Sequence, residues 1–158
     1  MNYLKSSGIS LLFLLFTAPA FTQSEASINK SDQTKPFLFS GFPDRIAVDI
    51  NDLKTVFSDI ASKGTNVAIK FADQTLPGFK GETVSTASKY NNSIQSVVIR
   101  STQFNGATLT LSSSTATDGA ARYTGRIISF QHADMYVLVK ENEKYYFIKK
   151  KYDDIINE

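Results

Sequence analysis

Acid–base and nucleophilic chemistry has few candidates in this chain, in which His132 is the single histidine. A catalytic histidine needs an acid or a nucleophile within about 3 Å, and Asp134 is its neighbour in sequence only. The chain has no cysteine and no Gly-x-Ser-x-Gly elbow, and no second ligand of histidine quality is offered for zinc. We therefore predict that His132 is a polar loop residue. We predict no catalytic residue, no metal ligand and no cofactor.

Carboxylates are scattered along the chain rather than paired. They stand at Asp49, Asp52, Asp59, Asp73, Glu82, Asp118, Asp134, Glu141 and Glu143. A glycosidase needs two carboxylates across a cleft, and distant positions can converge on folding. Most of these residues fall at predicted caps and turns, where aspartate has a conformational role. A small carboxylate-based hydrolase is therefore an alternative hypothesis, not the leading one.

Two short motifs resemble binding elements. Gly78-Phe-Lys-Gly81 matches the backbone clamp of KH domains, but that clamp joins two helices, whereas this one follows Pro77 in strand-forming sequence. Lys149–Lys151 is the one basic cluster. It suits either an acidic polymer, such as an envelope polysaccharide, or the protection of a sheet edge against pairing. We prefer the edge interpretation, and we treat the KH match as accidental.

Aromatic residues gather in the last third of the chain. Adjacent Tyr145 and Tyr146 must face opposite sides of a strand, so one of them is expected off the core. Cross-strand packing explains most of the aromatics, but an exposed tyrosine beside Arg122 or Arg126 would suit a sugar or a peptide. The candidate partner-binding residues are therefore Tyr123, Arg126, Tyr136 and Tyr145.

The first 23 residues read as an export signal. Met1–Lys5 is a short basic start, Ile9–Phe16 is a compact apolar run, and small residues follow at Ala18 and Ala20. A membrane-spanning helix needs about 20 apolar residues, and this run is about half as long. We expect cleavage, a secreted or periplasmic protein, and no membrane insertion of the mature chain. Without cysteine, it has neither disulfides nor a lipoprotein anchor.

Composition limits the partners of the mature chain. The 158 residues less this leader leave 135, enough for one domain with its own core. Lys5 leaves with the leader, so 16 basic residues face 15 acidic ones. A protein with so small a net charge is not expected to bind nucleic acid electrostatically over its whole surface. We expect a flexible lead-in and arm over residues 24–44 and a single domain over residues 45–158.

One helix is predicted near the start of that domain. Asp49 or Asn51 caps it, and an apolar stripe recurs at i, i+3, i+4, i+7 and i+8. The stripe consists of Leu53, Val56, Phe57, Ile60 and Ala61, and Gly64 follows as a stop. Residues 45–50 before it read as a short strand.

The rest of the chain is predicted to form strands. These cover residues 67–72, 82–88, 94–101, 108–112, 122–130, 135–140 and 144–150. Asn105-Gly106, Asp118-Gly119 and Glu141–Lys144 are hairpin turns, because short connections make neighbouring strands antiparallel. The fold class is therefore α+β. We expect a twisted antiparallel sheet of about seven to eight strands, open or rolled into a half-barrel, with one helix packed on it.

Two runs carry apolar side chains on both faces of a strand, Val97–Ile99 and Tyr136–Val139. Such strands indicate a covered sheet. The helix covers one face. The other face meets the arm, an opposite barrel wall or a partner.

The C-terminal half carries a resemblance. Its segments are Ile94–Ser101, Phe104–Ser112, Tyr123–Ile128, Asp134–Leu138 and Tyr146–Lys149. Together they resemble an uncharacterised small secreted domain family of Bacteroidetes-type bacteria, over residues 45–158 and best from residue 94. The resemblance implies an exported bacterial protein and brings no catalytic motif with it. Where relatives favour an aromatic residue, this chain has His132.

Our leading hypothesis is an exported, non-enzymatic domain that binds a protein, peptide or glycan partner in the cell envelope or outside the cell. The alternatives are the small hydrolase and an inhibitor or pro-segment-like partner of a secreted peptidase, which binds by strand addition.

Overall fold

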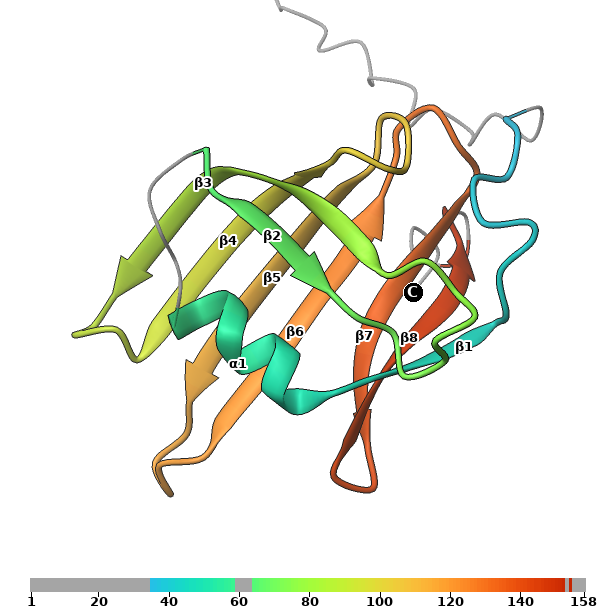
Figure 1. Ribbon diagram of the computed structural model, residues 1–158. Helices are drawn as coiled ribbons and strands as arrows, with labels where there is room; N and C mark the ends of the chain where they lie inside the picture. The colour runs from blue at the N-terminus through green and yellow to red at the C-terminus, as the bar shows by residue number, and fades with distance from the viewer. Residues whose placement is uncertain (1–34, 59–63, 153, 155–158) are drawn as a thin grey trace, which may run out of the picture. The chain divides into compact units, whose positions relative to one another are not determined.

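A computed structural model describes residues 35–58, 64–152 and 154. The predicted export signal, and the lead-in through residue 34, lie outside this part of the chain. In the described residues one helix and eight strands follow one another (Figure 1). They are β1 (Arg45–Val48), α1 (Ile50–Ser58), β2 (Asn66–Ile69), β3 (Phe79–Lys89), β4 (Ile94–Ser101), β5 (Thr108–Thr115), β6 (Ala121–Ile128), β7 (Asp134–Glu141) and β8 (Lys144–Lys151).

The strands form one antiparallel sheet in the order β1-β8-β7-β6-β5-β4-β3-β2. Strands β2 to β8 therefore pair in chain order, and only β1 pairs with a strand distant in sequence. The two ends of the sheet approach each other just after β2. There the Ala72 amide donates to the Ala47 carbonyl at 2.9 Å, and Val48 forms a single antiparallel bridge with Phe71. The sheet is consequently curled into a half-barrel.

Turn residues explain the chain reversals. Between β7 and β8 the chain turns in two residues, Asn142 and Glu143, whose φ angles are +48° and +64°, as a primed hairpin turn requires. Gly106 and Gly119 have φ of +70° and +78° in the other two predicted turns. The three turn predictions are confirmed.

Alternation of side chains separates the two faces of the sheet. On β5, Leu109 and Leu111 are fully buried, whereas Thr108, Thr110 and Ser112 between them are half-buried on the opposite face. We call the buried side, which α1 covers, the inner face, and the opposite side the outer face. The inner-face core draws on every strand.

Helix α1 packs on the inner face because one of its sides is apolar. Asp49 caps it, since its Oδ1 accepts the Asn51 amide at 2.8 Å. Leu53, Val56 and Phe57 are buried, as the stripe predicts, while Ile60 and Ala61 lie outside the described residues. Phe57 stacks on Tyr123 of β6 with ring centroids 5.7 Å apart, and Figure 1 shows α1 in front of β5 and β6.

The segment before β1 packs against the inner face near the start of β7. The buried Phe39 ring meets Phe104 and Tyr136 edge to face, at centroid distances of 5.5 and 4.9 Å. The Asp134 carboxylate accepts the Leu38 and Phe39 amides at 2.7 and 2.8 Å. We call residues 36–43 the arm. It covers part of the inner face.

The coarse fold prediction is confirmed, since the sheet is antiparallel, curled and accompanied by one small helix. The α+β label fits only loosely, because α1 has nine residues and the described chain is mostly β. Several strand boundaries differ from the prediction, since β1 ends at Val48, β5 continues to Thr115 and β6 ends at Ile128. Strand β3 begins at Phe79 instead of Glu82, and Phe71 forms its bridge with Val48 outside β2. No helix in the described residues is long and apolar enough to cross a membrane.

Candidate functional site

His132 contacts the hydroxyl group of Ser129, a contact that the sequence did not predict. Its Nδ1 is 2.8 Å from Ser129 Oγ, and its amide donates to the Ser129 carbonyl at 3.1 Å. The two residues thus close a turn between β6 and β7. Ser129 is only 1% exposed, so no substrate carbonyl can reach its oxygen. The Asp134 carboxylate is occupied by the arm. We interpret the contact as a turn hydrogen bond, for which the i, i+3 spacing of Ser and His was the available signal.

One pocket brings two carboxylates together. Asp49 and Asp52 line an open pocket of about 660 Å³ with Lys70, Phe71 and Gln74, beside the point where the ends of the sheet meet. Asp49 caps α1, and Asp52 Oδ2 accepts the Lys70 amide at 3.0 Å. Each carboxylate therefore already holds a backbone amide in place.

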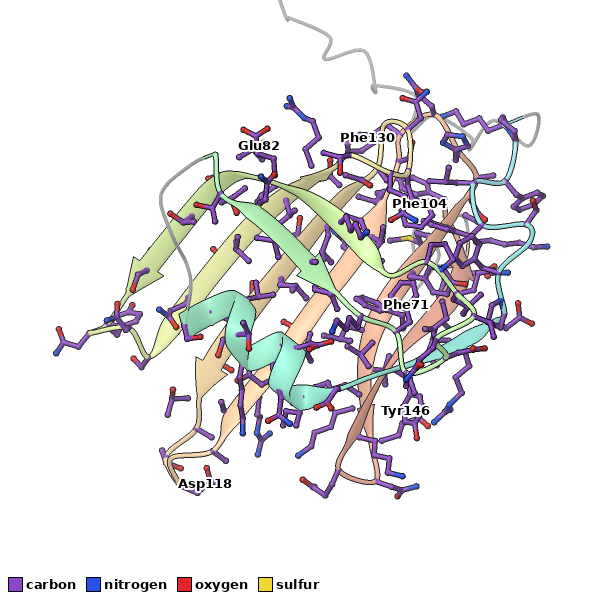
Figure 2. All side chains as sticks on the ribbon, viewed as in Figure 1. Phe71, Glu82, Phe104, Asp118, Phe130 and Tyr146 are labelled. Carbon is purple, nitrogen blue, oxygen red and sulfur yellow. The ribbon has the colours of Figure 1, made fainter. Side chains whose placement is uncertain are left out.

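Other carboxylates have similar local roles. Asp73 accepts the amide and the hydroxyl of Thr75, which lower the pKa of its carboxyl below the ordinary value. Asp118 accepts the Ala120 amide at 2.9 Å in the β5–β6 turn, at the opposite end of the sheet from Phe130 in Figure 2. Among the described residues no three histidine or carboxylate side chains gather as a metal ion requires.

Three of the four candidate partner-binding residues are buried on the inner face. Tyr123, Tyr136 and Tyr145 are 5%, 1% and 1% exposed, and only Arg126 is exposed. The four side chains therefore form no common surface. The sequence pattern could not assign the tyrosines, because either face of these strands can hold an aromatic ring.

The buried tyrosines instead satisfy backbone groups. Pairing between β6 and β7 stops at Gly125 and Leu138, although both strands continue. Beyond that point the Tyr145 hydroxyl accepts the Tyr123 amide at 3.1 Å, in place of a carbonyl from β7. The Tyr136 hydroxyl donates to the Pro43 carbonyl of the arm at 2.5 Å.

Of the adjacent residues Tyr145 and Tyr146, Tyr146 faces outward. Its ring lies under the Arg45 guanidinium, with 3.6 Å between Cζ and the ring centroid, and Arg45 also pairs with Glu141 at 2.8 Å. Figure 2 shows Tyr146 at the sheet end where β1 and β8 pair. An outward tyrosine beside an arginine thus exists, but with Arg45 and not with Arg122 or Arg126.

The lysine cluster divides between the two faces. Lys149 points to the inner side, where its Nζ donates to the Phe42 carbonyl and lies 3.4 Å from Asp44. Lys150 and Lys151 are in the part of β8 that continues beyond its pairing with β1, and both are exposed.

The outer face of β3 to β6 carries basic side chains that sequence spacing did not group. Lys89, Arg100, Arg122 and Arg126 are all exposed there, and we call these four the basic strip. The register aligns Arg100 with Glu82 and Thr108, and Arg126 with Thr110 and Val137. None of the four takes part in the ion pairs that the described residues form.

No family model, curated protein or solved structure matches this chain. The family resemblance of the C-terminal half therefore stays a prediction.

Proposed function

We propose that this protein is an exported, non-enzymatic binding domain whose outer sheet face contacts a partner in the cell envelope or outside the cell. The observation that carries the proposal is the basic strip, because exposed cations without ion-pair partners are available to a ligand. The inner face is occupied by the core, α1 and the arm. Export rests on the sequence of residues 1–23, and so does the secreted or periplasmic location.

The arrangement of polar groups argues against catalysis as the main role. The hydroxyl beside His132 is buried, and a nucleophile must be reachable by its substrate. The carboxylates with local partners hold turns, the helix cap or the arm. Each of these groups has a structural role that accounts for its position.

A hydrolase is the second candidate because of the pocket at Asp49 and Asp52. Two carboxylates beside an open pocket are what glycoside hydrolysis requires. The pocket is bordered by Phe71 and Leu76, which offer an apolar wall to a sugar ring. The hydrogen bonds from Asn51 and Lys70 to these carboxylates weaken this candidate.

Strand addition to a peptidase is the third candidate. It is supported by the edge of β3 that faces away from β4. Strand β2 pairs with β3 only over Phe79–Glu82, and the Thr83 amide then donates to the Thr65 carbonyl. Val84–Lys89 continues beside β4 alone among the described strands. A bulge between Thr83 and Ser85 introduces this segment, and bulges commonly protect an edge against pairing.

Capture from envelope fractions tests the binding proposal. The full chain is immobilised and exposed to solubilised envelope and to culture supernatant, and retained material is identified. We expect a partner that salt releases, and that a chain carrying R100S, R122S and R126S does not retain. Turnover of glycosidic or ester substrates that D49N and D52N abolish would overturn the proposal in favour of the hydrolase.

A further inference from the structure

Charge is unevenly distributed between the outer face and the rest of the described chain. Along the strands, the outward positions are basic at Arg45, Lys80, Lys89, Arg100, Arg122, Arg126, Lys144 and Lys150, and acidic only at Glu82 and Glu141. Most described acids lie elsewhere, at Asp44, Asp49, Asp52, Asp73, Asp118, Asp134, Glu143 and Asp154. A nearly neutral protein thus presents one positive face.

Ion pairs leave this charge available between β3 and β6. Glu141 is engaged with Arg45 at 2.8 Å, so these two charges of the face offset each other. Arg100 lies opposite Glu82 across the β3–β4 pair without forming an ion pair with it, and Arg122 and Arg126 take part in none of the ion pairs of the described residues. The strip therefore keeps a net positive charge that an anionic ligand can meet.

Sheet geometry fixes the spacing of these cations. Arg122 and Arg126 stand four residues apart on one strand, about 13 Å. Arg100 lies two strands from Arg126 and two residues along, which is about 12 Å. The array is regular, wide and open, so it fits an extended polymer with repeated negative charges better than a small ion.

Hydroxyl groups fill the space between the cations. The register places Ser96, Ser112 and Thr124 in one row across β4, β5 and β6, and Thr110 in the next row beside Arg126. Hydroxyls both donate and accept hydrogen bonds. They suit the alternating hydroxyl and carboxylate groups of an acidic sugar chain.

Aromatic side chains are missing from the outward strand positions of β3 to β6. Bases of single-stranded nucleic acid are held by stacking on aromatic rings, and neutral sugars commonly use the same platform. The exposed large apolar residues of this area are Ile94, at one end of β4, and Tyr90, in the turn just after Lys89. Two side chains bury too little apolar area to anchor a lipid surface.

We infer that the outer face of β3 to β6 binds an anionic polysaccharide, through Arg100, Arg122, Arg126 and Lys89, with Ser and Thr hydroxyls between them. The inference rests on the proposed binding function and gives its partner a chemical class. Carboxylate or sulfate groups meet the guanidinium groups, which match such anions in two parallel hydrogen bonds.

The test measures binding of the full chain to polygalacturonate by calorimetry at about 50 and 300 mM salt, between which the screening length falls from about 14 to 6 Å. We expect binding at low salt that weakens about tenfold or more at high salt. R100S/R122S/R126S should weaken it by about tenfold or more, since three exposed contacts are lost together. All three positions are exposed, so the variant is expected to unfold at the wild-type temperature.

The matched control removes the same charge elsewhere. K54S/K70S/K151S alters exposed lysines of α1, the loop after β2 and the end of β8, and should change the affinity by less than about twofold. Equal losses in both variants would show general charge attraction and overturn the strip as the site.

Three further probes separate the partner classes. Neutral dextran, duplex DNA and anionic phospholipid vesicles should each bind at least about tenfold more weakly than polygalacturonate at equal salt. Stronger binding to DNA or vesicles would overturn the polysaccharide assignment. Capture of a protein or a neutral glycan, with no binding to polygalacturonate, would overturn this inference and leave the binding function standing.

Discussion

At the scale of single residues, tyrosine hydroxyls replace missing backbone partners. The sheet opens between β6 and β7 beyond Gly125 and Leu138, and the Tyr145 hydroxyl accepts the amide that this leaves at Tyr123. An aromatic residue that sequence reasoning proposed for partner contact thus completes the inner face.

Removing that hydroxyl should destabilise the protein. Y145F leaves the buried Tyr123 amide without its acceptor, which costs about 1–2 kcal/mol in the free energy of unfolding. Urea denaturation measures the change. Y146F, whose side chain faces outward, is the matched control and should stay within about 0.5 kcal/mol. Equal losses in the two variants would contradict this role of Tyr145.

Alkaline pH should weaken the fold through Tyr136. Burial, followed by the charges of Asp134 and Asp44, raises the pKa of its hydroxyl well above the ordinary 10.0. Above about pH 10 the unfolded chain loses this proton and the folded chain keeps it. The free energy of unfolding therefore falls by up to about 1.4 kcal/mol per pH unit from this group.

Y136F supplies the comparison for the alkaline effect. It should be less stable at pH 8 by about 1 kcal/mol, because the hydrogen bond to Pro43 is lost. Its stability should also fall less steeply between pH 10 and 11. The unfolding free energies of the wild type and Y136F are measured by urea denaturation at each pH. If both fall with equal slope between pH 10 and 11, another group, such as Tyr123 with its raised pKa, carries the whole effect.

At the scale of elements, the arm depends on one carboxylate. Asp134 accepts two amides of the arm at a position that is 2% exposed. D134N replaces one accepting oxygen with a donor, so one amide loses its partner and the unfolding free energy should drop by about 1–3 kcal/mol. Faster proteolysis before residue 45 would accompany the loss. An unchanged cleavage rate would show that the aromatic contacts of Phe39 suffice.

The β7–β8 turn holds strain that glycine can relieve. Glu143 has φ of +64° without being glycine, which costs about 1 kcal/mol. E143G also removes an exposed ion pair with Lys140, worth about 0.3–0.5 kcal/mol. Because relief of the strain outweighs loss of the ion pair, the variant should be more stable by about 0.5 kcal/mol in thermal unfolding. K140A in the same assay isolates the ion pair, and a loss of stability in E143G larger than that in K140A would contradict the strain.

Local signals predicted most elements. Alternation in β5 and the Asn and Gly turn residues assigned the strands and hairpins, because these patterns depend on neighbours in sequence. They missed the start of β3 at Phe79, where Gly81 stands in the strand. The face of each tyrosine and the contact of His132 with Ser129 depend on how strands splay and turns close, which spacing alone does not specify.

At the scale of the whole molecule, the amino-acid composition gives the net charge but not where the charges lie on the surface. The near balance of 17 basic and 15 acidic residues hides a positive outer face, because the sheet register decides which charges become neighbours. Arg100 and Arg126 are distant in sequence and share one surface through β5. The basic strip was therefore beyond prediction from composition, and the fold was needed to reveal it.

The pairing of β1 with β8 has a consequence for how the chain is made. Arg45–Val48 pairs with Tyr145–Ile148, which lies far downstream in the sequence. A ribosome makes Arg45–Val48 long before Tyr145–Ile148, so this sheet cannot be completed until β8 has emerged. The first strand must wait without its neighbour.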